Sequence, residues 1–253
     1  MIDTHAHLYL PEFDTDLNEV VQRAKDSGME EIWIPGTDLL SLSQMEKLRT
    51  LDPNFFRFFG GLHPEDVTVN FRDDLAKIRQ IVDNGSYAGI GEIGLDLYWD
   101  KTFLNEQIEA LTYQLDWALE RKQPVLIHVR DAFDTIMPII RNYYPKGLKG
   151  IFHCFAGNLE QAIELTNEGF LLGINGVITF KKSPVATFLN QIPLTHIVTE
   201  TDSPYLAPMP HRGKRNESQY VSLIIQKLSE IYALPAQQIE SQTVLNAKRL
   251  LTE

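Results

Sequence analysis

The feature of this sequence that most restricts its fold is an alternation that repeats along the whole chain. A short apolar run, rich in β-branched or aromatic residues, ends in Gly, Pro or His, and a longer stretch with helical spacing follows. The runs that indicate strands are residues 2–5, 31–35, 55–62, 87–90, 124–127, 150–152, 170–174 and 195–198. Eight strand-then-helix units in 253 residues match the usual size of a (β/α)8 TIM barrel, in which helices cover parallel strands.

The helical stretches each carry one apolar face, as helices that cover a barrel should. The clearest pattern is formed by Leu104, Ile108, Leu111, Leu115 and Leu119. Two additional helices are expected near the C-terminus, over residues 217–232 and 236–251, and no Pro/Ser/Gly-rich linker divides the chain, so we expect a single domain over residues 1–253. A doubly wound open sheet is the structural alternative, but it would more often place a glycine-rich turn after its first strand, where this chain has histidines.

Charge and cysteine content limit the environment and the partners of the chain. The formal net charge of −11 disfavours a non-specific coating role on nucleic acid, although a local site could still hold phosphate. The single cysteine, Cys154, rules out an internal disulfide framework and fits a reducing compartment. The sequence has no membrane-spanning run and no signal peptide, so we expect a cytoplasmic, monomeric protein without a membrane partner.

Residues suited to metal chemistry collect at the ends of the predicted strands. Five of the seven histidines in the chain fall there, together with two carboxylates. These strand-end residues are His5, His7, His63, Glu92, His128, His153 and Asp202. A barrel brings the carboxyl ends of its strands into one ring, so these side chains are expected to become neighbours.

Imidazole and carboxylate ligands suit divalent ions such as zinc or manganese, and magnesium is a further candidate. Four histidines and two carboxylates exceed the needs of one tetrahedral ion, so we expect two ions per subunit, bridged by Glu92. The first ion is assigned to His5, His7, Glu92 and Asp202, and the second to Glu92, His128 and His153. His63, which precedes a proline, is expected to act in the site without binding metal.

A cluster of positive charge follows Asp202 in an otherwise acidic chain. The loop over residues 208–216 contains Arg212, Lys214 and Arg215, and it should overhang the metal site. Arg130, two residues after His128, is a second candidate. Because arginine pairs bidentately with phosphate oxygens, these positions favour a substrate that carries phosphate.

Together, these motifs resemble one family closely. The matching stretches are DTHAHL (3–8), GLHP (61–64), GEIGLD (91–96), HxRDA (128–132), HCFxG (153–157) and ETDxPYLAP (200–208), which continues into HRGKRN (211–216). The chain resembles the TatD family of metal-dependent deoxyribonucleases, within the amidohydrolase-like metal barrels, over nearly its whole length. Ser218 departs from the proline that this family often has two residues after Asn216.

The resemblance implies a metal-dependent phosphodiesterase, typically a 3′–5′ exodeoxyribonuclease acting on single-stranded or damaged DNA. It places metal roles on the six ligands assigned above and makes His63 and Glu200 functional positions, with Arg212, Arg215 and Asn216 in a substrate-binding loop. We expect Asp202 to orient the attacking water and to take its proton.

Other functions stay open from the sequence. A related barrel could hydrolyse amides, esters or small phosphoesters, including the ester of aminoacyl-tRNA. Many such enzymes bridge their metals with a carboxylated lysine at the fourth strand, whereas this chain has Glu92 there. A non-catalytic scaffold would have lost several ligands, and all six are present. The native metal and the choice between DNA and RNA are not determined by the residues.

Overall fold

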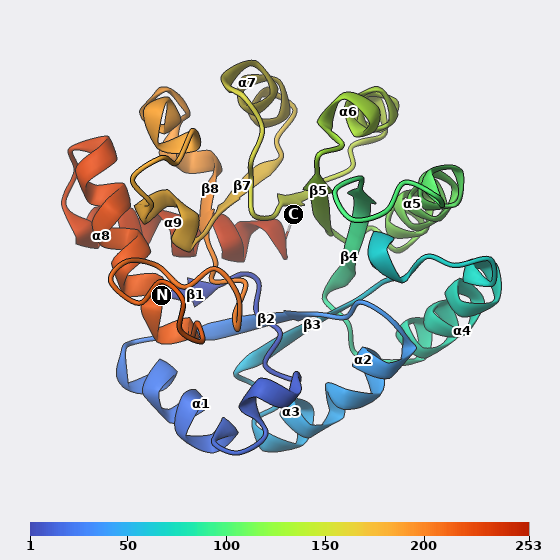
Figure 1. Ribbon diagram of the computed structural model, residues 1–253, viewed down its shortest axis with the longest axis horizontal. Helices are drawn as coiled ribbons and strands as arrows, with labels where there is room; N and C mark the ends of the chain where they lie inside the picture. Colours follow the sequence, from blue (N-terminus) through green and yellow to red (C-terminus); the bar gives the residue numbers. More distant parts are fainter. Residues whose placement is uncertain (253) are drawn as a thin grey trace.

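The computed structural model describes residues 1–252, in which eight parallel strands form a ring surrounded by helices (Figure 1). The strands are β1 (Ile2–Asp3), β2 (Glu31–Pro35), β3 (Phe56–Gly60), β4 (Gly89–Asp96), β5 (Val125–Arg130), β6 (Gly150–Phe152), β7 (Leu171–Ile174) and β8 (Ile197–Thr199). Each strand pairs with the next one in the sequence. The ring is nearly closed between β8 and β1, where the Thr4 N–H donates to the Thr199 carbonyl over 3.0 Å. The predicted TIM barrel is confirmed.

Helices follow the strands on the outside of the ring (Figure 1). The α-helices are α1 (Leu17–Asp26), α2 (Leu39–Gln44), α3 (Glu46–Leu51), α4 (Phe71–Asn84), α5 (Leu104–Arg121), α6 (Phe133–Arg141), α7 (Leu159–Asn167), α8 (Val221–Tyr232) and α9 (Ala236–Leu250). Short 3-10 helices span Pro11–Phe13, Pro64–Asp66, Tyr144–Lys146, Gly176–Thr179, Val185–Thr187, Leu189–Gln191, Leu194–His196 and Ser218–Tyr220. Among residues 1–252, no helix has both the length and the apolar character needed to cross a membrane.

Strands β4 and β5 extend further than the sequence predicts. β4 continues past Ile90 to Asp96, so Glu92 lies within a strand and not at its end. The strand contains a bulge, because Ile90 pairs with Val125 whereas Ile93 pairs with Ile127. A bulge inserts one extra residue and redirects the neighbouring side chains. This irregularity explains why the polar stretch after Ile90 resembles a loop in the sequence.

An apolar layer fills the lower part of the barrel interior. It consists of Ile2, Trp33, Phe59, Leu126, Ile151, Leu171 and Val198, packed against Ala247 of α9. Leu250 and Leu251, at the C-terminal end of α9, pack against the same layer. Side chains two residues apart on a strand point the same way, so His128, His153 and Glu200 follow directly above Leu126, Ile151 and Val198. The polar site therefore rests on a packed apolar floor.

Candidate metal and active site

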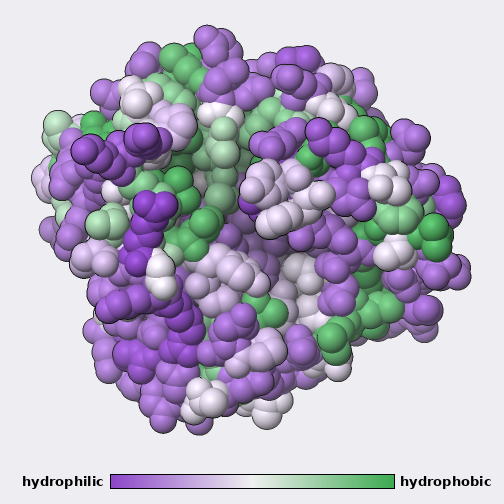
Figure 2. Space-filling model, in the orientation of Figure 1, coloured by the Kyte–Doolittle hydropathy of each residue, from purple (hydrophilic) through white to green (hydrophobic). Residues whose placement is uncertain are grey.

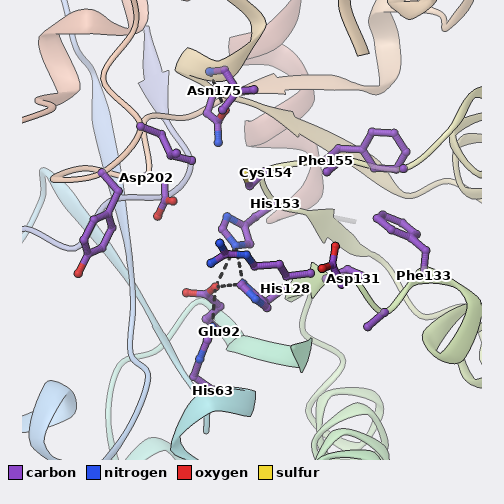
Figure 3. Close-up of a pocket in the computed structure, with 18 of the residues that line it drawn as sticks. His63, Glu92, His128, Asp131, Phe133, His153, Cys154, Phe155, Asn175 and Asp202 are labelled. Carbon is purple, nitrogen blue, oxygen red and sulfur yellow. Dashed lines mark hydrogen bonds and ion pairs between the residues drawn. The ribbon is translucent and has the colours of Figure 1, made fainter. Parts of the chain in front are cut away.

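Glu92 occupies the centre of the site, and its two carboxylate oxygens face two different groups of imidazoles. The Oε2 atom lies 3.1 Å from His5 Nε2 and 3.6 Å from His7 Nε2. The Oε1 atom lies 2.9 Å from both His128 Nδ1 and His153 Nε2. Figure 3 shows Glu92 in contact with this second group. This division between two oxygens is what a carboxylate bridging two cations requires.

Asp202 completes the first group of donors. Its Oδ1 atom lies 3.4 Å from His7 Nε2 and 4.0 Å from His5 Nε2, while the two Nε2 atoms are themselves 3.2 Å apart. The loop carrying Asp202 is fixed by the buried Asp3 carboxylate, which accepts hydrogen bonds from the Thr201 N–H and hydroxyl at 2.8 and 2.6 Å. The Asp202 N–H also donates to the His5 carbonyl over 2.8 Å, so the segment after β8 presents Asp202 to the histidines that follow β1.

The tautomer of His63 follows from its hydrogen bonds. The Glu65 backbone N–H donates to His63 Nδ1 over 3.2 Å, so Nδ1 is unprotonated and the proton of the neutral ring lies on Nε2. That Nε2 is 3.3 Å from Glu92 Oε1. A protonated nitrogen donates a hydrogen bond and cannot bind a cation. The geometry therefore supports a hydrogen-bonding role for His63, as the sequence predicts.

Asp96 is a site residue that the sequence reasoning missed. The buried carboxylate of Asp96 accepts a hydrogen bond from His128 Nε2 over 3.0 Å. A proton on Nε2 leaves Nδ1, the atom that faces Glu92, with a free lone pair. The signal was present in the GEIGLD stretch, but the strand was expected to end before Asp96 was reached. Tyr9 plays a similar part at His7, with its hydroxyl 3.0 Å from His7 Nδ1.

Glu200 lies behind His153 and is completely buried. Its Oε1 atom accepts a hydrogen bond from the Cys154 N–H and lies 3.5 Å from His153 Nδ1. The carboxylate occupies space that only glycine leaves free on β7, because a Cβ at Gly173 would lie 2.2 Å from Glu200 Oε2. Glu200 can therefore position His153 and Cys154, and its predicted catalytic role stays a prediction.

The charge state of these groups follows from burial and from their neighbours. Burial lowers the pKa of His5 and of His63, so both rings are neutral at pH 7. For Glu92, burial opposes ionisation, but the nearby imidazoles prevail and hold the pKa of the carboxyl well below its usual value. For His153, burial is likewise outweighed, here by Glu92 and Glu200, and its pKa is raised. Ionised Glu92 is thus available as a ligand.

These donors fit divalent cations. Four sets of possible donor atoms each lie within 4.8 Å of one another: His5, His153 and Asp202; His5, His7 and Glu92; His63, Glu92 and His128; and Glu65, Asp96 and His128. In the third set, His63 is the member whose proton on Nε2 opposes metal binding. Mixed imidazole and carboxylate donors at these spacings are the chemistry that zinc, manganese and related ions bind. The structure thus brings together all six residues predicted as ligands.

The backbone is strained at several positions around the hollow. Asp131, Cys154, Asp202 and Leu206 all have φ between 46° and 58°, a region that residues other than glycine seldom occupy. All four residues line the same hollow, which has a volume of about 1210 Å³. Figure 2 shows apolar patches on its walls and a mainly hydrophilic surface around it. Such strain is concentrated at functional sites in many proteins.

The predicted substrate-binding residues lie in different surroundings. Arg130 lines the hollow, whereas Arg215 pairs with Asp16 and Glu217 at 2.7 and 2.9 Å. Asn216 is buried and donates to the carbonyls of Thr201 and Tyr205. The guanidinium of Arg212 stacks 4.7 Å from the centre of the Phe180 ring. Arg215 and Asn216 thus hold the loop in place, and their contact with substrate stays a prediction.

A model of the family described as TatD related DNase matches residues 2–252. The chain belongs to the TatD family. Its relatives include YabD of Bacillus subtilis, named as an uncharacterized metal-dependent hydrolase, which is 38% identical over 99% of this chain and 98% of its own length. The 3′–5′ ssDNA/RNA exonuclease TatD of Erwinia tasmaniensis is 28% identical over 99% of both chains.

Among solved structures, the TatD homologue YJJV of Escherichia coli superposes with a TM-score of 0.92 and 26% identity, covering 100% of this chain and 98% of that one. Membership of the TatD family identifies the chain as a metal-dependent hydrolase and confirms the resemblance noted in its motifs. The clusters of histidine and carboxylate described above are residues that could bind the metal.

Proposed function

We propose that this TatD-family hydrolase is a 3′–5′ exonuclease that cleaves phosphodiester bonds at the ends of single-stranded DNA, using two divalent cations. The observation that carries the proposal is the division of Glu92, whose Oε2 faces His5 and whose Oε1 faces His128 at 3.1 and 2.9 Å. Two-cation sites of this kind serve in-line displacement at phosphorus in many nucleases. The relative from Erwinia tasmaniensis, whose name states an ssDNA/RNA exonuclease, supports the choice of substrate.

His5, His7 and Asp202 would hold one cation and His128 and His153 the other, with Glu92 between them. When bound, the cations supply Lewis-acid polarisation of a phosphoryl oxygen and make water acidic enough to ionise near neutral pH. Zn²⁺, Mn²⁺ and Mg²⁺ all suit a mixed set of donors.

Asp202 is the residue that takes the proton of the attacking water. Burial disfavours the ionised form, but the hydrogen bond from His7 and the neighbouring imidazoles lower the pKa of Asp202, so it is a carboxylate at neutral pH. Its Oδ1 faces His7, and no hydrogen bond to its Oδ2 is found within residues 1–252. Oδ2 is therefore free to accept the proton.

The other residues of the site bind the charge of the substrate. The Nε2–H of His63, which faces Glu92 Oε1 at 3.3 Å in this structure, would donate to a phosphate oxygen of the substrate in its place, since Nδ1 is already occupied by the Glu65 N–H. The Arg130 guanidinium, which lines the same hollow, can hold a phosphate in a bidentate manner. Both donors stabilise charge that increases on the phosphoryl oxygens during displacement.

The test is cleavage of a single-stranded DNA oligonucleotide labelled at its 5′ end, by chelator-treated protein reloaded with each candidate metal. We expect a ladder that shortens from the 3′ end, no cleavage after chelation, and loss of turnover in Asp202→Asn at saturating metal. RNA of the same sequence and an aminoacyl-tRNA are assayed in parallel. If the protein rapidly deacylates the aminoacyl-tRNA and leaves the DNA uncut, the nuclease proposal is refuted and the esterase alternative is supported.

A further inference from the structure

The loop after β4 (Gly89–Asp96) carries two neighbouring aromatic side chains that are largely exposed to water. Tyr98 is 51% exposed and Trp99 is 68% exposed, and their rings meet edge to face with centroids 4.7 Å apart. The other two tryptophans, Trp33 and Trp117, are buried. Two adjoining exposed aromatic rings form a small apolar patch, and such patches often mark binding sites.

Arg130 of β5 packs against these rings. Its guanidinium carbon lies 3.9 Å from the centre of the Tyr98 ring and 5.4 Å from that of Trp99. Stacking of this kind fixes the plane of the guanidinium and leaves its N–H groups, which lie in that plane, able to donate hydrogen bonds. Tyr98, Trp99 and Arg130 together form a positively charged aromatic platform, in which the two rings stand nearly perpendicular to each other.

Among the described residues, 1–252, Arg130 of this platform and Arg212 are two arginines that have no salt bridge and stack on aromatic rings, and of these two only Arg130 lines the hollow. Salt bridges engage eight other arginines, namely Arg23, Arg49, Arg57, Arg72, Arg79, Arg121, Arg141 and Arg215. Within residues 1–252, Arg130 forms no salt bridge and its guanidinium makes no hydrogen bond, although it lies in a hollow that contains several acidic side chains. A guanidinium left unpaired at such a place is suited to an anionic ligand.

The platform adjoins the candidate metal site. Trp99 and Arg130 line the same hollow as His63, Glu92 and His128. Arg130 follows His128 by two residues on the same strand, so both side chains leave β5 on one side. A phosphate held by Arg130 would therefore lie beside the metal ligands, with the aromatic rings next to it at the mouth of the hollow.

We propose that the Tyr98–Trp99–Arg130 platform binds an unpaired nucleobase, stacked on Trp99, of a nucleotide next to the phosphodiester that is cleaved. The proposal rests on the proposed nuclease function and adds a specificity site to it. A base inside a duplex has both faces covered by its neighbours, whereas a base of a single strand can turn out to stack on a protein ring, so the platform would favour single strands over duplex DNA. Because every base has such a face, it would tolerate all four bases.

The first test measures binding without turnover. Trp99 is the exposed tryptophan in the chain, so quenching of tryptophan emission reports on it selectively. Oligothymidylate is added to the metal-loaded Asp202→Asn protein, and an abasic oligomer of equal length serves as the matched ligand. We expect oligothymidylate to quench the emission, the abasic oligomer to leave it unchanged, and Trp99→Phe to abolish the response. Equal quenching by both oligomers, or none by either, would overturn the proposal.

The second test measures kinetics in the wild-type background. Trp99→Ala should raise KM for single-stranded DNA by between about 5-fold and about 150-fold, the range for loss of one base–aromatic stack, with a much smaller change in kcat. Trp99→Phe should restore most of the affinity, and KM for the abasic oligomer should not change. Tyr113→Ala, which alters an exposed ring on α5 (Leu104–Arg121), is the control for surface aromatic loss.

The two proposals fail in different ways. Unchanged KM of Trp99→Ala on DNA that the wild type cleaves would refute the platform and leave the nuclease function standing. Absence of any DNA cleavage by the metal-loaded wild type would refute the nuclease function, while base-dependent quenching of Trp99 would still support a nucleobase site. Equal melting temperatures of the variants and the wild type exclude misfolding as the cause.

Discussion

Replacing Asp96 by Asn should weaken metal binding, although Asp96 is not itself one of the proposed metal ligands. Asp96 contacts His128 Nε2, whereas the cation is assigned to His128 Nδ1. Asp96 Oδ1 accepts the Tyr98 backbone N–H over 2.9 Å, while Oδ2 accepts from His128 Nε2 over 3.0 Å. An asparagine in this place would keep its single oxygen on the Tyr98 N–H and would turn its amide N–H toward His128 Nε2. His128 would then accept on Nε2 and carry its proton on Nδ1, the atom that should bind the cation.

The magnitude follows from this change of tautomer. Loss of the residue that orients a metal-binding histidine typically costs 10-fold to 100-fold in metal affinity, or about 1.4 to 2.7 kcal/mol. The effect should fall on the cation held by His128 and His153, because His5 and His7 lie on the other oxygen of Glu92. The burial of Asp96, which is 1% exposed, leaves little room for water to replace the lost hydrogen bond.

Isothermal titration calorimetry of chelator-treated protein with Mn²⁺ measures the affinity and the number of bound cations directly. We expect one of two binding events to weaken in Asp96→Asn while the other keeps its affinity. Asp100→Asn, on the same loop and also an acceptor for a backbone N–H, is the matched control and should bind like the wild type. Unchanged affinity and stoichiometry in Asp96→Asn would refute the assignment of the His128 tautomer on which the reasoning depends.

Three other perturbations test different parts of the molecule. Gly173→Ala places a Cβ 2.2 Å from Glu200 Oε2 in a buried site, so the free energy of unfolding measured with urea should fall by about 1 to 3 kcal/mol. An unchanged urea midpoint would contradict the close packing of Glu200 against Gly173. The hydrogen bond from Arg215 lowers the pKa of Asp16 to about 2, so ionised Asp16 stabilises the fold above about pH 4, and this contribution is lost as the pH falls toward 2. Asp16→Asn should therefore be less stable than the wild type by about 1 kcal/mol at pH 6, with a difference that shrinks on acidification; a difference independent of pH would disprove the linkage. Chelation should lower the melting temperature reversibly, since a metal present at 100 times its Kd adds about 2.7 kcal/mol, and a melting temperature insensitive to both chelator and added metal would argue against a bound cation.

The sequence predicts the barrel well because its signals are local and repeated. Apolar runs and helical spacing suffice to place the strands, and strand ends converge in any barrel. The long helix predicted from its leucines is α5, where Leu111 and Leu115 are buried as expected. The segment between β7 and β8 differs, since residues 176–196 form 3-10 turns in place of an α-helix. After β2, the first helix, α2, begins at Leu39, where Asp38 and Ser41 form a capping box.

The details of the site depend on contacts between residues that are distant in the sequence. The pairing of Arg215 with Asp16 joins positions 199 residues apart, and no local sequence pattern predicts it. An arginine beside a metal motif therefore looks like a phosphate ligand in the sequence, although its charge is already neutralised in the fold. Arg130 has the same appearance in the sequence but lacks a carboxylate partner within residues 1–252. Only the three-dimensional structure separates the two.

The apolar floor of the barrel explains why stability and metal binding should be coupled. Glu92, Glu200 and His153 are almost entirely buried, and His128 is mostly buried. Burying charged groups is costly unless they are paired. The packed layer beneath them, closed by α9, prevents these side chains from moving down to relieve the crowding. Cations bound between them would neutralise the carboxylates and replace the lost hydration. The donors are therefore held in place by the fold at a free-energy cost that metal binding offsets, which is the physical basis for the expected effect of chelation.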